Sequence, residues 1–217
     1  MAATLVGGIP EKTVERLSEY RRTLVASHKQ GITHIFSHVI AGIHGITAVQ
    51  VRRDLMLIGF SSDNKKGYDV KELIDFISSI LDGETTTNIG VIGMGHLGQA
   101  ITKYFNDKGL KLRITAAFDV DPTKVGTQID NIPCHHMDSF AEVVESEDLS
   151  IVIVSSPTSV AQGLVLPIIN AGIKGVLNFT STPLNFPQGI AVENYDITTL
   201  LEKVAYFVKE TEENQDK

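Results

Sequence analysis

The sequence predicts an α/β protein in two parts, a helical first part followed by a part in which strands alternate with helices. Three observations lead to this prediction. Apolar residues recur at helical spacing before residue 82. Beyond residue 87, apolar runs of strand length alternate with amphipathic stretches, as in a parallel sheet covered on both faces. Between the two parts, the polar segment "DGETTT" (82–87) is expected to be a linker.

The composition is that of a soluble globular protein, because 42% of the 217 residues are hydrophobic and 21% are charged. The apolar runs are too short and too interrupted to cross a bilayer, and the N-terminus lacks the pattern of a secretion signal. We therefore expect a cytoplasmic protein with no membrane partner. The single cysteine, Cys134, excludes an intramolecular disulfide and any Cys-x-x-Cys motif.

The first part begins with an amphipathic helix. Pro10 suits a first helical position because its φ is fixed, and Gly31 follows the last turn. The apolar positions of this helix are Val14, Leu17, Tyr20, Leu24 and Val25.

Two further short helices predict a helix-turn-helix. The first covers about Ser37 to Gly42, and a turn containing Gly45 follows. Thr47 and Gln50 then form a capping box, in which the Thr47 side chain takes the amide of Gln50 while the Gln50 side chain reaches back.

The polar segment "GFSSDNKKGYDV" (59–70) predicts a β-hairpin wing behind these helices, with Lys65 and Lys66 at its tip, and "VKELIDFISSIL" (70–81) predicts a helix. Residues 1–85 carry equal numbers of basic and acidic residues, so the formal net charge of −7 belongs to residues 86–217. The basic pairs of the first part can make a positive face for DNA phosphates, while the start of the recognition helix can meet base edges. The residues expected to contact DNA are Thr47, Ala48, Gln50, Arg52, Arg53, Lys65, Lys66 and Tyr68.

The second part opens with the glycine-rich segment "NIGVIGMGHLG" (88–98). Gly93, Gly95 and Gly98 have the G-x-G-x-x-G spacing that lets a backbone close on a dinucleotide pyrophosphate. A strand precedes them, and a helix with apolar positions from Leu97 to Phe105 follows. The next strand, "LRITAAFDVD", carries Asp119, 21 residues beyond Gly98. An acidic residue there accepts hydrogen bonds from the adenine ribose and repels a 2′-phosphate, so NAD(H) is expected rather than NADP(H).

The remaining pattern continues the alternation of helices and strands. Helices are expected in "SFAEVVES" (139–146) and "SVAQGLVLPIINAG" (159–172), and strands in "LSIVIVSS" (149–156) and "KGVLNFT" (174–180). The last predicted helix, "DITTLLEKVAYFVKE" (196–210), has a broad apolar face that suits either packing on its own domain or a subunit contact.

One single histidine and one cluster of chemically active side chains give less specific signals of function. His96 stands between the glycines near the phosphate position, where an imidazole could help binding or simply be an exposed residue at a helix start. Cys134, His135 and His136 are neighbours, but successive side chains of a strand point to opposite faces, so no metal site is expected.

Six segments carry a resemblance that covers the chain from Pro10 to about Val208. They are "TAVQVRRDL", "KKGYDV", "GVIGMGHLGQA", "AFDVDPTKVGT", "AGIKGVLNFT" and "AVENYD". Their order and spacing resemble those of the Rex family of redox-sensing transcriptional repressors. The resemblance implies a homodimer that binds palindromic operator DNA when free of NADH or with NAD+, and releases it when NADH binds.

The resemblance also implies a fold and roles for particular residues. It implies a winged helix-turn-helix domain (1–83), a Rossmann-like parallel-sheet NAD(H)-binding domain (84–193), and a C-terminal domain-swapped helix and tail (194–217). Arg22 and Asp196 would pair in the DNA-competent arrangement, and Tyr104 would take part in the switch near the nicotinamide. Together with the glycine motif, it implies that NADH and NAD+ contact Gly93, Met94, Gly95, His96, Leu97, Gly98, Tyr104, Asp119, Ser156, Pro157, Asn178 and Ile197.

Two other functions fit part of the sequence. A small NAD-dependent oxidoreductase is the main alternative, with Tyr104 as a catalytic acid, but the nucleotide-binding pattern leaves no room for a substrate domain. A nucleotide- or acyl-CoA-binding module without DNA contact would leave the basic helix unexplained. We therefore expect a protein that is not an enzyme and has no catalytic residues.

Overall fold

The computed structural model describes residues 5–6, 8–61, 66–106 and 111–215. Contacts divide the chain into two compact units, Met1–Glu84 and Thr85–Lys217, and each is described by itself. The boundary lies inside the polar segment 82–87.

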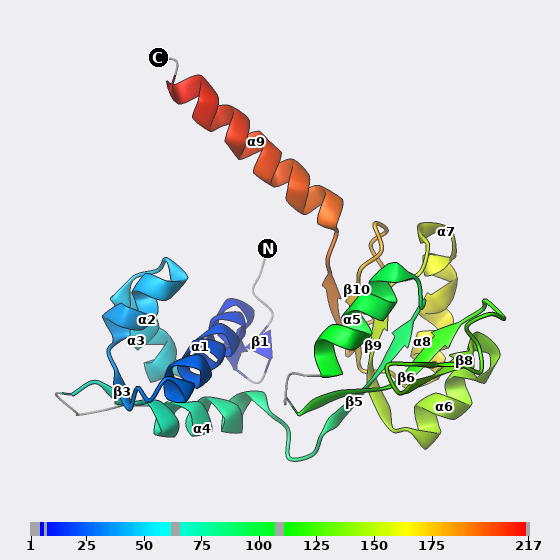
Figure 1. Cartoon of the computed structure of the whole chain (residues 1–217), viewed down its shortest axis with the longest axis horizontal. Helices are drawn as coiled ribbons and strands as arrows, with labels where there is room; N and C mark the ends of the chain where they lie inside the picture. Colours follow the sequence, from blue (N-terminus) through cyan, green and yellow to red (C-terminus); the bar gives the residue numbers. More distant parts are fainter. Residues whose placement is uncertain (1–4, 7, 62–65, 107–110, 216–217) are drawn as a thin grey trace. The chain divides into compact units, whose positions relative to one another are not determined.

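The described part of the first unit contains four helices: α1 (Glu11–Lys29), α2 (Ser37–His44), α3 (Ala48–Leu57) and α4 (Val70–Leu81) (Figure 1). Their apolar faces meet in one core because apolar residues recur at helical spacing on each helix. The fully or almost fully buried members include Leu17, Tyr20, Leu24, Ile40, Val51, Leu55, Leu73 and Ile77.

The predicted helix-turn-helix is present. α2 ends at Gly45, whose φ of +64° is the left-handed conformation that glycine adopts most readily. α3 then begins after the cap residue Thr47. The prediction that Pro10 is the first helical residue was wrong by one position, because Pro10 is the extended cap residue and α1 starts at Glu11.

Two short strand pairs complete this unit. β1 (Leu5–Val6) pairs with β2 (Ile9–Pro10), and β3 (His34–Ile35) pairs with β4 (Tyr68–Asp69), both antiparallel. The prediction of a β-hairpin within 59–70 was wrong in its pairing, because β4 pairs with β3 from ahead of α2. Residues 59–61 and 66–67 carry no strand, and residues 62–65 lie outside the described residues. The partner β3 was missed, because a two-residue strand shows no period in a sequence.

In the described residues of the second unit, seven strands form one sheet in the order β11-β10-β9-β5-β6-β8-β7. All neighbours are parallel except β7 and β8, which are antiparallel. Their bounds are β5 (Thr87–Ile92), β6 (Leu112–Asp119), β7 (Gln128–Ile129), β8 (Ile132–His136), β9 (Leu149–Val154), β10 (Gly175–Asn178) and β11 (Ala191–Asn194). The short edge strands β7 and β11 were not predicted.

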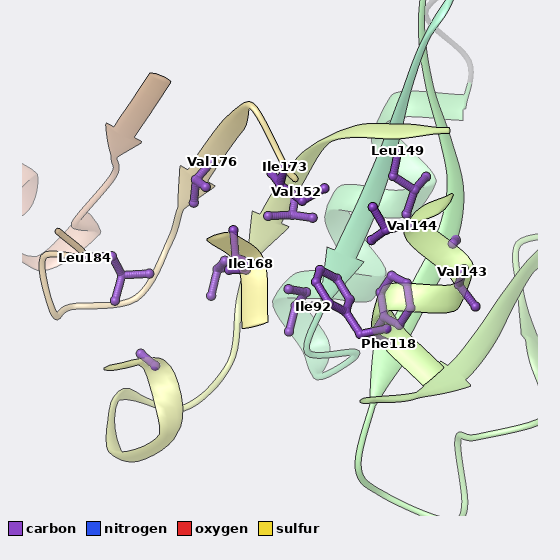
Figure 2. Packing of buried hydrophobic residues seen from close by; sticks show 14 residues of the cluster. Ile92, Phe118, Val143, Val144, Leu149, Val152, Ile168, Ile173, Val176 and Leu184 are labelled. Atoms are coloured by element: carbon purple, nitrogen blue, oxygen red, sulfur yellow. The ribbon is translucent and has the colours of Figure 1, made fainter. Parts of the chain in front are cut away.

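Helices cover both faces of this sheet, as the continuously apolar strands predict. On one face, α5 (His96–Asn106) contributes Ile101 and Phe105 to a core with Val91 and Ile153. On the other face, α6 (Phe140–Ser146) and α8 (Val165–Asn170) pack on alternate strand residues. Figure 2 shows this second core, in which Phe118 and Ile92 from the sheet lie among Val143, Val144 and Ile168 from the helices.

The single helix predicted over 159–172 is divided into three segments. These are α7 (Thr158–Ala161), a 3₁₀ turn (Gln162–Leu164) and α8 (Val165–Asn170). Gly163 and Pro167 explain the division, since glycine weakens a helix interior and proline removes a backbone donor.

The last helix, α9 (Ile197–Gln215), keeps its apolar side chains exposed in the single chain. The exposed large side chains are Ile197, Leu200, Leu201, Val204, Tyr206, Phe207 and Val208. Among the described residues, no helix is long and apolar enough to span a membrane.

Candidate functional site

A cavity of about 950 Å³ opens at the carboxyl ends of β5, β6, β9 and β10. Its position is the one at which parallel α/β sheets bind nucleotides. The wall comes from five stretches of the chain: Ile92–Leu97 without Met94, Phe118–Val120 with Lys124, Ser155–Thr158, Phe179–Ser181 and Asp196–Thr198. Met137, Asp138, Val160, Leu164 and Pro167 complete the lining.

The three glycines of the predicted fingerprint are required for three different reasons. Gly93 has a φ of +93°, and a Cβ there would lie 2.8 Å from the Ser156 amide nitrogen. A Cβ on Gly98 would collide with the Gly93 carbonyl oxygen, so α5 can approach β5 only with glycine at this position. Gly95 is different, because a Cβ there would meet no atom within 4 Å. The fold does not need a glycine at position 95, but a ligand that approaches this backbone does.

Asp119 lies at the end of β6 and faces the fingerprint. Its Oδ2 atom accepts hydrogen bonds from the Met94 amide at 2.8 Å and from Lys124 Nζ at 3.0 Å. Its Oδ1 atom accepts from the amides of Val120 and Asp121 at 2.8 and 3.0 Å. Burial alone would raise the pKa of Asp119, but these hydrogen bonds outweigh it and lower the pKa. The carboxylate is therefore charged at neutral pH.

The two serines after β9 have different surroundings. The Ser155 hydroxyl donates to the Gly93 carbonyl at 2.8 Å, which holds the glycine turn against β9. The Ser156 hydroxyl is buried and has no hydrogen-bond partner within the described chain, although Ser156 lines the cavity. A buried hydroxyl without a partner is costly. Together with the open cradle at Gly95, this hydroxyl fits a polar ligand such as a dinucleotide.

The structure brings together eight of the residues predicted to bind the dinucleotide. Gly93, Gly95, His96, Leu97, Asp119, Ser156, Pro157 and Ile197 line the cavity. Four others lie outside its lining, namely Met94, Gly98, Tyr104 and Asn178. Met94 is buried in the core beside α5 while its amide binds Asp119, and Gly98 acts inside the turn. Tyr104 is 62% exposed on α5.

Asn178 supports the cavity wall from behind. Its side-chain amide donates to the Thr182 carbonyl at 2.9 Å and to Asn194 Oδ1 at 2.8 Å. Its side-chain oxygen accepts from the amide and the hydroxyl of Thr180 at 3.0 and 2.8 Å. These four bonds fix the loop that carries Thr180 and Ser181 into the cavity.

Sequence reasoning missed several lining residues, of which Lys124 and Asp138 bear a charge. Lys124 contacts Asp119 and also lies 3.4 Å from Asp121 Oδ2. A lysine five residues after Asp119, beyond a turn marked by Pro122, is the signal that could have found it.

The neighbouring cysteine and histidines do not converge. Cys134 is buried among apolar residues of the core beneath α5, and burial, reinforced by the charge of Asp119, raises the pKa of its thiol. His135 instead stands beside Phe118 on the other face of the sheet. In the described parts of the chain, no three His, Cys, Asp or Glu residues form a group that could hold a metal ion. His96 is exposed at the start of α5 and borders the cavity.

In the first unit, α3 presents an exposed face that carries Arg52 and Arg53. Arg52 Nη1 donates to Ser37 Oγ at 3.0 Å. This hydrogen bond links the exposed face of α3 to the first residue of α2. Lys66 is exposed, and Lys65 lies outside the described residues. Tyr68 is half-buried and packs beside Phe60 with ring centroids 6.0 Å apart.

Half of the predicted capping box is present. Thr47 Oγ1 accepts from the Gln50 amide at 3.1 Å, as expected. The Gln50 side chain does not reach back to Thr47. Its Nε2 atom donates to Asp54 Oδ1 at 2.9 Å, and this charge-assisted bond to a buried carboxylate one turn along the helix holds the side chain away from the Thr47 amide. Ala48 is half-buried against the core of this unit.

Asp54 is the centre of a buried polar network that joins α3 to α1. Its side chain is only 2% exposed. Arg16 donates to both carboxylate oxygens, from Nε to Oδ2 and from Nη2 to Oδ1, each at 2.7 Å. Tyr20 donates to Oδ2 at 2.8 Å. This network orients the recognition helix on its neighbour, and sequence patterns gave no sign of it.

The Asp54 network predicts a dependence of stability on pH. Burial alone would raise the pKa of Asp54, but hydrogen bonds from Arg16, Tyr20 and Gln50 outweigh it and lower the pKa below the usual range of an aspartate. A carboxyl with a lowered folded-state pKa stabilises the fold fully above its unfolded pKa and loses this contribution as pH falls through the folded pKa. We expect the difference in unfolding free energy between the wild type and Asp54→Asn to be constant above about pH 5 and to shrink below about pH 4. Urea unfolding at each pH measures this difference, and a constant difference down to pH 2.5 would contradict it.

Two family models match the chain, one in each unit. Residues 8–55 match the model described as "Putative DNA-binding protein N-terminus". Residues 84–182 match the model described as "CoA binding domain".

Two curated relatives are similar over almost the whole chain. The redox-sensing transcriptional repressor Rex of Leuconostoc citreum (strain KM20) is 36% identical over 200 residues, which cover 92% of this chain and 93% of the relative. The protein of the same name from Carboxydothermus hydrogenoformans is 38% identical over 203 residues, which cover 93% of this chain and 97% of the relative.

Solved structures of RSP, a Rex-family repressor, have the same fold at 28% sequence identity. The complex of RSP with β-NADH superimposes with a TM-score of 0.84 and covers 96% of this chain and 98% of that chain. The complex of RSP with β-NAD+ and operator DNA gives a TM-score of 0.87, with 96% of each chain covered.

Proposed function

Because the chain belongs to the Rex family of redox-sensing transcriptional repressors, we propose that it binds operator DNA as a homodimer and releases it when NADH binds to its Rossmann-like unit. One observation carries this proposal: a helix-turn-helix with an arginine-bearing face and an open dinucleotide cradle occur in the same short chain. The protein is a transcriptional repressor rather than an enzyme. We place it in the cytoplasm, where operator DNA and NAD(H) are both present.

The residues of the cavity suggest how the dinucleotide is held. The backbone at Gly93–Gly98 would receive the pyrophosphate at the start of α5, and Asp119 would accept hydrogen bonds from the adenine ribose. Ser156, Pro157 and Ile197 would border the nicotinamide half of the ligand. Met94 and Asn178 would act from behind the wall through the contacts described above.

The redox signal is a difference of charge at the nicotinamide ring. The ring is cationic in NAD+ and neutral in NADH, so a cavity can bind the two forms differently. A coupling of about 3 kcal/mol between NADH and DNA would correspond to roughly 150-fold, and linkage requires that DNA weaken NADH binding by the same factor.

For the switch, we propose that Arg22 pairs with Asp196 in the DNA-competent arrangement and that Tyr104 takes part near the nicotinamide. Arg22 is exposed on α1, so it is accessible to a partner. Asp196 accepts from the Thr198 amide at 3.0 Å and from the Thr199 hydroxyl at 2.7 Å, and it lines the cavity. Since a carboxylate at the start of α9 borders the ligand, a bound ligand can change which partner it prefers.

The apolar face of α9 supports the proposed dimer. Leu200, Leu201, Val204 and Phe207 are between 50% and 64% exposed in the single chain. A helix with so much exposed apolar surface is stabilised by burial against another subunit, as a helix exchanged between two subunits would be.

Titration of operator binding with NADH tests the proposal. We expect a palindromic duplex, selected from a random pool, to bind at constant NAD+ and to dissociate as NADH rises, measured by gel shift. Operator binding that is indifferent to NADH would contradict the proposal. Measuring NADH turnover with carbonyl substrates beside this titration separates a repressor from an oxidoreductase.

Charge reversal on α3 is expected to separate the two activities. Arg52→Glu or Arg53→Glu should weaken operator binding at least about 100-fold, because an attraction to phosphate becomes a repulsion. NADH affinity should stay unchanged, since the cavity belongs to the other unit. Fluorescence anisotropy of labelled operator and NADH fluorescence measure the two affinities. Lys29→Glu, the same charge change on α1, is the control, and an equal loss in this variant would argue against a specific role for α3.

A further inference from the structure

The carboxylate of Asp119 has no free acceptor position. A carboxylate offers about four lone-pair sites. Here the two on Oδ2 are used by the Met94 amide and Lys124 Nζ, and the two on Oδ1 by the amides of Val120 and Asp121. A ribose that binds at Asp119 must therefore share or replace one of these donors.

Lys124 is the donor that can move. The other three are backbone amides fixed by the glycine turn and by the end of β6. The lysine side chain is 29% exposed and lines the cavity. Its ammonium group also lies 3.4 Å from Asp121 Oδ2, so it keeps a partner when it shifts away from Asp119.

We propose that Lys124 is a second ribose-binding residue and that it sets how strongly the site distinguishes NAD(H) from NADP(H). This inference rests on the proposed binding of NAD(H). A ribose hydroxyl placed between the two groups can donate to Asp119 and accept from Lys124 at the same time. Asp119 alone cannot do this, because a carboxylate only accepts.

The charges around this position determine the response to a 2′-phosphate. Asp119 and Asp121 contribute two negative charges and Lys124 one positive charge, and Asp138 at the rim of the cavity adds a highly exposed carboxylate. The balance is negative and disfavours a phosphate. Lys124 nevertheless weakens this discrimination, because it is the one lysine or arginine in the described lining of the cavity. Removing its charge should make the site more selective for NAD(H).

Two substitutions separate the charge of Lys124 from its hydrogen bond. Lys124→Met should weaken NADH binding about fivefold through the lost hydrogen bond, and NADPH binding about 50-fold or more through the lost charge as well. Lys124→Gln keeps a donor without charge, so NADH affinity should change less than about twofold while NADPH affinity falls about tenfold. Both affinities are measured by fluorescence titration at fixed ionic strength.

Lys174→Met is the matched control, since this exposed lysine precedes the amino end of β10, whereas the cavity lies at the carboxyl ends of the strands. It should leave both affinities and their ratio unchanged. Thermal unfolding of each variant shows that the fold is kept. Equal changes in NADH and NADPH affinity in Lys124→Met would overturn the inference, as would tighter NADH binding, which would make Lys124 a competitor of the ribose. A wild-type protein that binds no NADH would overturn the proposed function instead.

Discussion

Replacing Asp54 by alanine is expected to lower the unfolding free energy of the first unit by about 3–5 kcal/mol. The substitution leaves the Arg16 guanidinium without its bidentate partner and removes the acceptor of the Tyr20 and Gln50 side chains. An uncompensated charge beside a buried site costs more than the pair itself contributes. Because a small unit is stabilised by only a few kcal/mol in total, most molecules should lose the orientation of α3, and operator binding with it.

Chemical unfolding followed by circular dichroism measures this loss. Asp75→Ala is the matched control, because Asp75 also pairs with a basic side chain, Lys71 at 2.7 Å, but both groups are more than 60% exposed. An exposed ion pair of this kind contributes little to stability, because solvent screens it. NADH affinity should persist in both variants. If the two alanine substitutions had equal effects, the network around Asp54 would not hold α3 in place.

Replacing Gly95 by valine is expected to weaken dinucleotide binding at least about 100-fold, while the fold is kept. No atom lies within 4 Å of the position of the new Cβ, and the backbone there is not in the left-handed region. The side chain would occupy the space that a pyrophosphate needs against the start of α5. The variant should still bind operator DNA but should no longer release it when NADH is added.

Gly163→Val provides the control for this substitution. Gly163 also has open space around its Cβ position and an ordinary φ, but it does not line the cavity. It should bind NADH like the wild type, as titration of the cofactor fluorescence would show. Gly98→Ala should instead destabilise the second unit, since its Cβ collides with the Gly93 carbonyl. Undiminished NADH affinity in Gly95→Val would show that the ligand does not approach this backbone.

The sequence predicted those features that depend on local pattern. The glycine turn, the central strands and the cap at Thr47 each leave a fixed spacing, and the structure has all of them. The two-residue strand β3 leaves none, because it is stabilised by β4, which follows only after α2 and α3. β7 pairs with the adjacent β8, but two residues are too few to show a period.

The same distinction between local spacing and distant contacts holds for the residues of the site. Asp119 was predicted from its distance along the chain, but its hydrogen bonds to Met94 and Lys124 depend on how β6 meets the glycine turn. The destination of the Gln50 side chain could not be predicted either. The sequence allows the Gln50 side chain either to complete a capping box with Thr47 or to bond Asp54. The burial of Asp54 against α1 decides between the two.

The placement of Cys134 has a consequence for how such a sensor reports. The chain has one thiol, and it lies inside the apolar core beneath α5 with a raised pKa, so almost no thiolate meets the solvent. Peroxides and disulfides act on thiolates, and their products are often slow to reverse. A repressor built in this way would follow the metabolic supply of reducing equivalents without being chemically altered by oxidants, so that each molecule could report many times.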